Sequence, residues 1–254
     1  MPIINRRSLL GGLALAAASR PLSAATAEML AVDAGEGQVA VTRYAADRGG
    51  KRPAVILLHG SRGFDLNRRA YERHVNALTA GGIDAYLARY FTDTDAQLLG
   101  KMTSPARREA YESERFNAWA ERTSSVLTAV RGAHGSGGIG LLGFSLGGYV
   151  AAVTAARDER VSALAVMYGG IPKDIATDVK RLPPLIELHG EADRNVPLAK
   201  GEELVRLGKA VGASAEIVRY PGKAHGFDFS DDDPMTADAV GRVARFFQAH
   251  LNPV

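Results

Sequence analysis

Short apolar runs alternate with longer helical patterns along most of this 254-residue chain. Several runs, such as residues 54–58 (Ala-Val-Ile-Leu-Leu), are apolar at every position rather than at every second one. That pattern is typical of strands buried on both faces of a parallel sheet. Parallel strands need crossover connections, and the helical patterns between the runs supply them. The sequence therefore predicts a single α/β domain with a mostly parallel, twisted sheet and helices on both faces.

The expected elements follow from the same patterns. Strands are predicted at residues 39–44, 54–58, 84–88, 139–142, 163–167, 185–188 and 216–220. Helices are predicted at residues 68–80, 105–133, 146–157, 198–211 and 234–250. In sheets of this kind ligands bind beyond the carboxyl ends of the strands. The residues that directly follow each strand are therefore the ones to search for a functional site.

The first 27 residues have the three parts of an export signal. Arg6 and Arg7 precede a short apolar stretch at residues 9–18, and small residues follow up to Ala27. The stretch is too short to span a bilayer, and paired arginines resemble the twin-arginine type of bacterial signal. We expect cleavage after Ala27 or after Ala25 and a periplasmic or secreted domain over residues 28–254. The alternative is an uncleaved alanine-rich tail.

Charge and composition exclude several classes of function. The net charge of +3 comes from three arginines within the first 27 residues, and the remaining 28 basic residues balance the 28 acidic ones. The excess is therefore part of the signal and does not predict a nucleic-acid partner or, once the signal is removed, a membrane partner. With no cysteine there is no disulfide, zinc–thiolate site or thiol nucleophile. No clustered metal-ligand spacing or phosphate-binding loop occurs, so neither a metal nor an organic cofactor is expected.

A G-x-S-x-G pattern follows the strand predicted at residues 139–142. Ser145 lies between Gly143 and Gly147, at a strand-to-helix turn of the kind that a nucleophile elbow requires. Such a sharp turn lifts the serine hydroxyl above the sheet, and side chains at the two glycines would collide with neighbouring backbone. We therefore predict that Ser145 is a nucleophile. The alternative is a glycine-rich turn that only packs, or that binds an anion at the helix end.

A serine hydroxyl needs a base to take its proton. In chains with this elbow the acid and then the histidine follow the serine. Of the histidines, His225 and His250 come late enough, and His250 belongs to the last helical pattern. His225 lies in a loop between the last strand and that helix, so we predict that it is the base.

The acid should follow the strand predicted at residues 185–188. Asp193 is the candidate in the segment His-Gly-Glu-Ala-Asp at residues 189–193, with Glu191 as its rival. An acyl-transfer site also needs two N–H donors for an oxyanion. The backbone N–H groups of Leu146 and Ser61 are predicted for that role, with Arg62 as the alternative to Ser61. His59, in the same loop as Ser61, is expected to support the loop rather than to act as a second base.

These motifs resemble the α/β-hydrolase superfamily, and more narrowly the dienelactone hydrolase family. The resemblance covers roughly residues 39–251. It rests on the elbow around Ser145, the His-Gly-Glu-Ala-Asp segment followed by Val196-Pro197, and the Ala-His-Gly-Phe segment at residues 224–227. The resemblance implies an α/β-hydrolase fold and hydrolysis of an ester or a lactone.

Some positions depart from the family's best-known members. Those enzymes carry a cysteine at the elbow and an acidic partner for the resting thiol, whereas this chain has Ser145 and offers Gly60-Ser61 in the corresponding loop. They also resemble one another in holding the lactone carboxylate with arginines. This chain has Phe227, Asp228 and Phe229 after its predicted base. The resemblance therefore does not extend to dienelactone as the substrate.

Substrate contacts are predicted around the strand ends and in residues 91–120. By its resemblance to the family, this segment is expected to form a loop and a helix beside the pocket. The candidates are Arg62, Tyr90, Trp119 and Phe227. Aromatic residues of the segment 91–120 have an alternative role, which is to pack the long helix. Arginines near the strand ends, Arg62 and Arg89, fit either an anionic substrate or surface ion pairs.

The sequence thus predicts an exported serine hydrolase that acts on a small-molecule ester or lactone through an acyl-enzyme. A peptidase similar to the prolyl oligopeptidases is the nearest enzymatic alternative, although the propeller domain of those enzymes is absent. A hydrolase-fold binding module with little catalysis is the alternative from another class. Nothing in the sequence fixes the oligomeric state.

Overall fold

A computed structural model describes residues 27–47, 51–134 and 137–251. Its strands form one sheet in the order β1-β2-β4-β3-β5-β6-β7-β8. The strands are β1 (Ala27–Asp33), β2 (Gln38–Tyr44), β3 (Ala54–Leu58), β4 (Asp84–Arg89), β5 (Ile139–Phe144), β6 (Val161–Met167), β7 (Leu185–Gly190) and β8 (Ala215–Tyr220). The predicted export signal, apart from Ala27, lies outside the described residues.

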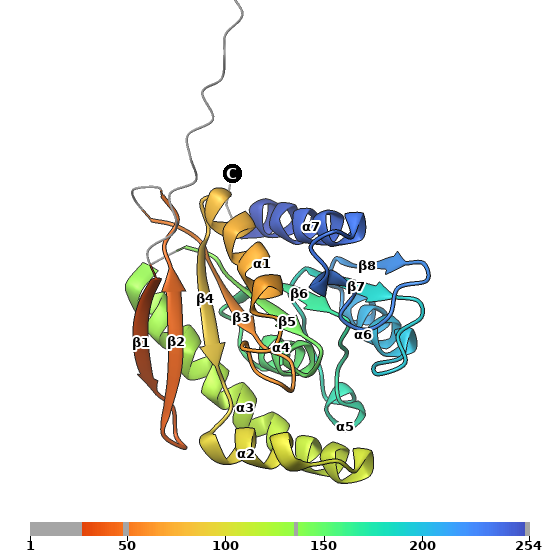
Figure 1. Cartoon of the computed structure of the whole chain (residues 1–254). Coiled ribbons are helices and arrows are strands. Elements are labelled where there is room, and N and C mark those ends of the chain that lie inside the picture. Colours follow the sequence, from red (N-terminus) through yellow and green to blue (C-terminus); the bar gives the residue numbers. More distant parts are fainter. Residues whose placement is uncertain (1–26, 48–50, 135–136, 252–254) are drawn as a thin grey trace, which may run out of the picture.

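Helices connect the strands and cover the sheet (Figure 1). They are α1 (Arg68–Ala80), α2 (Asp93–Lys101), α3 (Pro105–His134), α4 (Leu146–Arg157), α5 (Lys173–Ala176), α6 (Leu198–Ala210) and α7 (Pro234–Leu251), with a short 3-10 helix, η1 (Phe227–Phe229). Every pairing from β4 across to β8 is parallel, and β1 and β2 add an antiparallel edge. The predicted mostly parallel α/β sheet is therefore confirmed.

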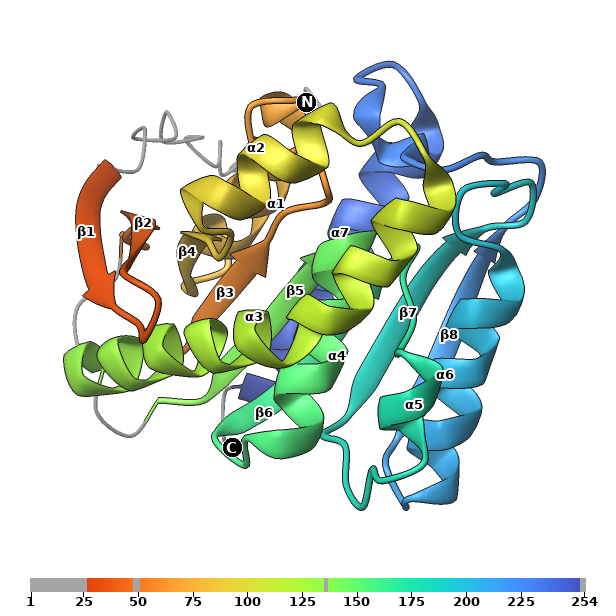
Figure 2. The ribbon, with the colours of Figure 1, turned by 90° about the horizontal axis from the view of Figure 1, so that it is seen from below.

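The helices form two layers, with α1 and α7 on one face of the sheet and α3, α4 and α6 on the other (Figure 1 and Figure 2). Strand β3 shows why its run is apolar throughout. Val55 and Leu57 pack with α1 and α7, whereas Ile56 and Leu58 pack with α3 and α4, and all four side chains are fully buried. Within the described residues, no helix is both long and apolar enough to cross a membrane.

Each predicted strand and helix is present, with ends that differ by at most two residues. The prediction missed β1, α2 and α5. Strand β1 is an edge strand whose side chains are mostly exposed, so it lacks the apolar run that marks the central strands. Helix α2 is short, but Thr92 and Asp95 form a capping box at its start, which is a signal the sequence contained. Helix α5 is a single turn.

Candidate active site

Ser145 lies at the sharp turn between β5 and α4. Its backbone has φ 53° and ψ −119°, a conformation that a residue with a side chain adopts only under strain. The backbone N–H of Ser145 donates to the carbonyl of Met167 at the end of the neighbouring strand β6, at 2.9 Å. Because that bond ties the turn to the carboxyl edge of the sheet, the Ser145 side chain stands at the edge where a ligand would bind.

The two glycines that flank Ser145 are required by close backbone approach. A Cβ atom at Gly143 would lie 2.2 Å from the carbonyl oxygen of Gly147. One at Gly147 would lie 2.3 Å from the carbonyl oxygen of Leu58 and 2.5 Å from that of His59. Real Cβ atoms do not approach backbone atoms so closely, so the predicted collisions at both positions are confirmed. The turn can form only with glycine on each side of the serine.

His225 and Asp193 come from two loops that are joined to each other through the backbone. The N–H of Ala192 donates to the carbonyl of Lys223 at 2.9 Å. A Cβ at Gly190 would lie 2.3 Å from that same carbonyl oxygen, so glycine is needed there for the loops to meet. This contact sets the loop after β7 against the loop after β8, and it fixes the aspartate relative to the histidine.

The three side chains predicted to act together lie within hydrogen-bond reach of one another. His225 Nε2 is 3.0 Å from Ser145 Oγ, and His225 Nδ1 is 2.7 Å from Asp193 Oδ2. An ionised Asp193 only accepts, so Nδ1 carries the ring proton and Nε2 is free to accept the hydroxyl proton of Ser145. The arrangement is that of a nucleophile, a base and an orienting acid.

Asp193 is held as a carboxylate. Its side chain is buried, and its Oδ1 accepts the backbone N–H groups of Asn195 and Val196 at 2.8 and 2.9 Å. Burial alone would raise the pKa of Asp193. Hydrogen bonds from His189, His225 and the backbone outweigh burial and lower that pKa well below its usual range. Asp193 therefore stays ionised at neutral pH and can stabilise a protonated His225.

The alternatives to these residues lie elsewhere. Glu191 and His250 are exposed, and the ring within hydrogen-bond reach of Ser145 Oγ is that of His225. His59 is buried, with its ring stacked on Tyr90 at 4.4 Å, and its Nδ1 lies 2.8 Å from the carbonyl oxygen of Gly60. Burial lowers the pKa of His59 to about 4, so the ring is neutral at neutral pH. As expected, His59 supports its loop.

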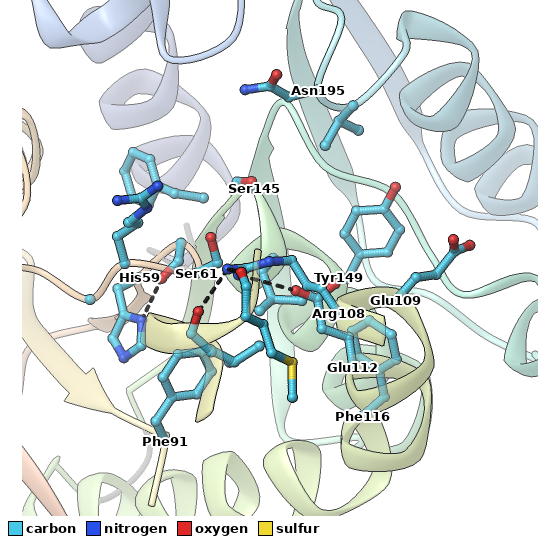
Figure 3. A pocket seen from close by; sticks show the side chains of 18 of the residues that line it. His59, Ser61, Phe91, Arg108, Glu109, Glu112, Phe116, Ser145, Tyr149 and Asn195 are labelled. Atoms are coloured by element: carbon cyan, nitrogen blue, oxygen red, sulfur yellow. Dashed lines mark hydrogen bonds and ion pairs between the residues drawn. The ribbon is translucent and has the colours of Figure 1, made fainter. Parts of the chain in front are cut away.

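The predicted oxyanion donors flank Ser145. Leu146 begins α4, and its N–H belongs to the first turn, where the partial positive charge of a helix gathers. On the other side, a Cβ at Gly60 would lie 3.6 Å from Ser145 Cβ, so the loop after β3 packs directly beside the nucleophile. The tight turn in that loop uses the N–H of Gly63 for its own hydrogen bond, to the carbonyl of Gly60. Ser61, at the corner of this turn, lines the same cleft as Ser145 (Figure 3).

An open cleft of about 2100 Å³ surrounds Ser145 and His225. One wall is apolar and comes from α2, α3, α4 and the loops beside them; it includes Phe91, Met102, Phe116, Leu146, Tyr149 and Ile171 (Figure 3). Charged side chains such as Arg62, Arg89 and Lys173 lie around it. The cleft is thus large enough for a small organic molecule, and its apolar wall lies beside the nucleophile.

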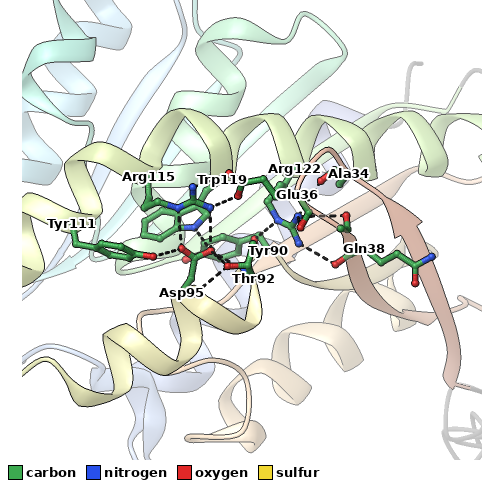
Figure 4. A network of polar contacts seen from close by, with 11 residues as sticks. Ala34, Glu36, Gln38, Tyr90, Thr92, Asp95, Tyr111, Arg115, Trp119 and Arg122 are labelled. Carbon is green, nitrogen blue, oxygen red and sulfur yellow. Dashed lines mark hydrogen bonds and ion pairs between the residues drawn. The ribbon is translucent and has the colours of Figure 1, made fainter.

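Trp119 and Tyr90 do not line the cleft, so the prediction that they contact a substrate is wrong. Both side chains are fully buried. The Trp119 indole N–H donates to Asp95 Oδ2 at 3.0 Å, within a polar network that also includes Tyr111 and Arg115 (Figure 4). These bonds turn the aromatic ring away from the cleft and into the contact between α2 and α3.

Tyr90 is held away from the cleft by a hydrogen bond. Its O–H donates to the carbonyl of His59 at 2.9 Å, which points its ring inward beneath the loop after β3. The prediction that Phe227 contacts a substrate is also wrong, because that side chain packs in the core. Phe227 is buried against Tyr220, with ring centroids 4.5 Å apart. Phe229, two residues later, lines the cleft in its place. Of the predicted substrate contacts, only Arg62 lies on the cleft surface.

The segment 91–120 divides between the two roles considered for it. Phe91, Met102 and Phe116 line the cleft, whereas Trp119 and Tyr111 pack around Asp95. Arg89, also at the cleft edge, makes a two-pronged ion pair with Asp65.

Glu112 is a cleft residue that the sequence analysis missed. It lies in the wall on α3, its side chain is 20% exposed, and Arg108 is 3.9 Å away. Burial raises the pKa of Glu112 to about 7, against the lowering effect of Arg108. Its position four residues after Arg108 looks like an ordinary surface pair, so nothing in the sequence marks it.

Replacing Glu112 with glutamine is expected to stabilise the protein at alkaline pH but not at acidic pH. The folded-state pKa of about 7 lies above the usual 4.5, so the cost of ionising Glu112 in the folded state is absent below pH 4.5 and complete above pH 7. We expect the free energy of unfolding of E112Q to exceed that of the wild type by about 1–3 kcal/mol at pH 8. Urea denaturation at pH 4.5 and pH 8 measures the difference.

The matched control is E114Q, because Glu114 is exposed on the same helix and is not among the charges that shift the pKa of Glu112. Its unfolding free energy should follow that of the wild type at both values of pH. Equal stabilisation by E112Q at both values would show that the gain does not come from the ionisation of Glu112.

Comparison with known structures places the chain in the α/β-hydrolase fold. A dienelactone hydrolase from Anabaena variabilis superposes with a TM-score of 0.72 at 19% identity, over 91% of this chain and 100% of that one. An esterase from Pyrobaculum calidifontis superposes with a TM-score of 0.68 at 21% identity, over 88% of this chain and 83% of that one. The predicted fold is therefore confirmed.

The model of the dienelactone hydrolase family matches residues 40–251, so the chain belongs to that family. Curated relatives are similar over shorter stretches. A protein of Methylorubrum extorquens assigned as a carboxymethylenebutenolidase is 30% identical over 124 residues, which is 42% of this chain and 42% of the relative. A Synechocystis protein with the same assignment is 32% identical over 127 residues, 44% of this chain and 51% of the relative. The matched region thus spans about half the length of these relatives or less.

Proposed function

We propose that this protein is a serine hydrolase that cleaves a carboxylic ester or a lactone through an acyl-enzyme. The observation that carries the proposal is the chain of contacts from Ser145 Oγ to His225 Nε2 at 3.0 Å and from His225 Nδ1 to Asp193 Oδ2 at 2.7 Å. The strained elbow and the open cleft around Ser145 support it. Membership of the dienelactone hydrolase family agrees with this chemistry.

The proposed reaction has two halves. In the first, Ser145 Oγ attacks the ester carbonyl while His225 Nε2 accepts its proton, and the charge that develops on the carbonyl oxygen is stabilised by the N–H groups of Leu146 and Ser61. Protonated His225, stabilised by Asp193, then gives the proton to the leaving alkoxide. In the second half, His225 Nε2 takes a proton from a water molecule, which attacks the acyl-enzyme, and returns that proton to Ser145 Oγ as the acid is released.

Labelling and turnover test the proposal together. An organophosphonate probe is expected to label the wild-type protein at Ser145, and a series of p-nitrophenyl esters and lactones is expected to give measurable kcat/KM values. Short and medium acyl chains should be preferred if the apolar wall that contains Phe116 and Tyr149 receives the acyl group. A protein that is neither labelled nor active on any of these esters would instead be a binding module on a hydrolase fold.

We also propose that the enzyme is exported. The support is the sequence of residues 1–27, with Arg6 and Arg7 before a short apolar stretch and small residues up to Ala27. N-terminal sequencing of the protein from a periplasmic or culture fraction should give a chain that starts at Glu28 or at Thr26. A chain that keeps Met1 would contradict export.

A further inference from the structure

Two charged side chains lie buried beneath the proposed triad and have no part in the reaction described above. Glu187 and His189 are in the middle and at the end of β7, and their side chains are fully buried. Because they are two residues apart in a strand, both point to the same face of the sheet, the face that α6 covers. Parallel strands in this position usually carry apolar residues, so an ion pair here calls for an explanation.

The helix opposite is built to leave room for this pair. Gly201 of α6 lies directly over it, and a Cβ there would be 2.7 Å from His189 Nδ1 and 2.9 Å from Glu187 Oε1. Glu187 Oε1 also accepts the backbone N–H of Gly169 at 3.1 Å. Removing two charges from water costs free energy, and apolar side chains of similar volume stabilise a core at least as well. The pair is therefore not explained by stability.

The contacts of His189 indicate that its ring is protonated. Nδ1 lies 2.8 Å from Glu187 Oε1, and Nε2 lies 2.9 Å from the carbonyl oxygen of Val196. Both partners are acceptors, and only the imidazolium form donates from both nitrogens. Burial acts against that charge, but hydrogen bonds to Asp193 and Glu187 raise the pKa of His189 to about 10.

The positive ring also touches the proposed triad. His189 Nε2 is 3.5 Å from Asp193 Oδ2, the same oxygen that accepts from His225 Nδ1. Asp193 Oδ2 is thus shared between two imidazole rings. The negative Glu187 contacts the far nitrogen of His189, so the nearer charge of the pair, as seen from Asp193, is positive.

We propose that Glu187 and His189 are positioning residues, whose buried ion pair holds a positive charge against Asp193 Oδ2 and so keeps His225 in its base form to lower pH. This inference rests on the proposed hydrolase function. A cation beside Asp193 partly offsets the negative charge that would otherwise favour protonated His225. The reaction then stays active in more acidic solution than a triad without the pair would allow.

Other titratable groups face the triad and the pair from the elements around them. From α4, Tyr149 lies near Glu187, and burial together with that charge raises its pKa. From the loop after β6, Tyr168 packs its ring 4.7 Å from that of His225, and burial raises its pKa well above the usual value. Both phenols are therefore neutral at acidic and neutral pH.

The remaining charges lie further out. Arg219 is opposite His189 in the register of β7 and β8, but it is exposed and pairs with Glu202 of α6 at 2.8 Å. Asp228 accepts from the Tyr168 hydroxyl at 2.8 Å, and its other oxygen lies 3.6 Å from His74 Nε2. Among the described groups, the pair is thus the one whose charge touches Asp193 directly without taking part in the reaction.

The test is the pH dependence of kcat/KM for a p-nitrophenyl ester in H189Q, E187Q and the double variant. The two glutamines keep hydrogen-bonding groups of similar size but carry no charge. We expect the acidic limb of the profile to move to higher pH by about 0.5–1 unit in each single variant. In H189Q the buried Glu187, whose pKa burial already raises, takes up a proton, and in E187Q the buried His189 loses one, so the double variant should show the same shift as either single one. E191Q, an exposed carboxylate of the same loop, is the control and should leave the limb in place.

A second readout does not depend on turnover. Imidazole 15N NMR of the wild-type protein should show His189 protonated on both nitrogens at neutral pH, and E187Q should abolish that signature. A neutral His189 in the wild type, or variants with lower kcat but an unmoved acidic limb, would overturn the inference. If the wild type is neither labelled at Ser145 nor active, the proposed function itself fails, and the two failures are thereby told apart.

Discussion

The Ser145→Ala variant is expected to lose at least about 10⁴-fold in kcat, since no other group can form the acyl-enzyme. The loss should appear in kcat rather than in KM, because the hydroxyl acts on the reacting carbonyl and the cleft wall that binds the ester is unchanged. Organophosphonate labelling should disappear in the same variant. Steady-state kinetics on a p-nitrophenyl ester and mass spectrometry of the labelled protein measure both effects.

The fold should survive this change. Alanine keeps the Cβ that already occupies the elbow at φ 53°, and removing the hydroxyl leaves the bond from the Ser145 N–H to the Met167 carbonyl in place. Ser113 lines the same cleft on α3, so S113A is a matched control that should keep wild-type kinetics. An S145A protein that retains esterase activity would refute the assignment of the nucleophile.

The central strands and the proposed triad could be predicted because local rules govern them. The run at residues 54–58 is apolar throughout because its side chains fill both layers of the core. Glycines at positions 143 and 147 are required by backbone contacts less than 3 Å away, and such a constraint leaves a mark in the sequence. Asp193 and His225 each follow a strand, and parallel strands bring their carboxyl ends to one edge.

The cleft surface was harder to predict, since it depends on contacts between segments that are far apart in the chain. Tyr90 directly follows β4, which is where a ligand contact is expected, yet its hydroxyl bonds to the carbonyl of His59 and the ring turns inward. Trp119 is oriented by Asp95, a residue of the helix that the prediction missed. A pattern along the sequence gives the position of an aromatic residue but not the partner that orients it.

The buried polar groups show the same limit. Glu187 and His189 alternate with apolar neighbours in β7, and the sequence predicts only a strand there. Their pairing depends on the packing of α6, whose Gly201 leaves room for both side chains. Glu112 was equally hidden, because its burial depends on the tertiary packing around α3. Charges in a core are set by tertiary neighbours, so their roles follow from the structure.

The Gly147→Ala variant is expected to unfold more easily by about 2–4 kcal/mol and to lose most of its activity. The added methyl group would lie 2.3 and 2.5 Å from the carbonyl oxygens of Leu58 and His59, so β3 or α4 has to move. Either movement separates Leu146 from Ser61. The two proposed N–H donors would then no longer point at the same oxyanion. Chemical denaturation gives the free energy of unfolding, and kcat at a temperature where the variant is folded gives the second effect.

Gly132→Ala is the matched control, since Gly132 lies in α3 and, apart from the nearby backbone of its own helix, nothing lies within 4 Å of an added Cβ. Alanine favours helix over glycine, so this variant should be as stable as the wild type or more stable by up to about 1 kcal/mol, with unchanged activity. The contrast separates the loss of a glycine in general from the loss of this glycine. A G147A protein with the unfolding free energy and kcat of the wild type would contradict this prediction. Close backbone contact would then not explain why glycine follows the nucleophile by two residues.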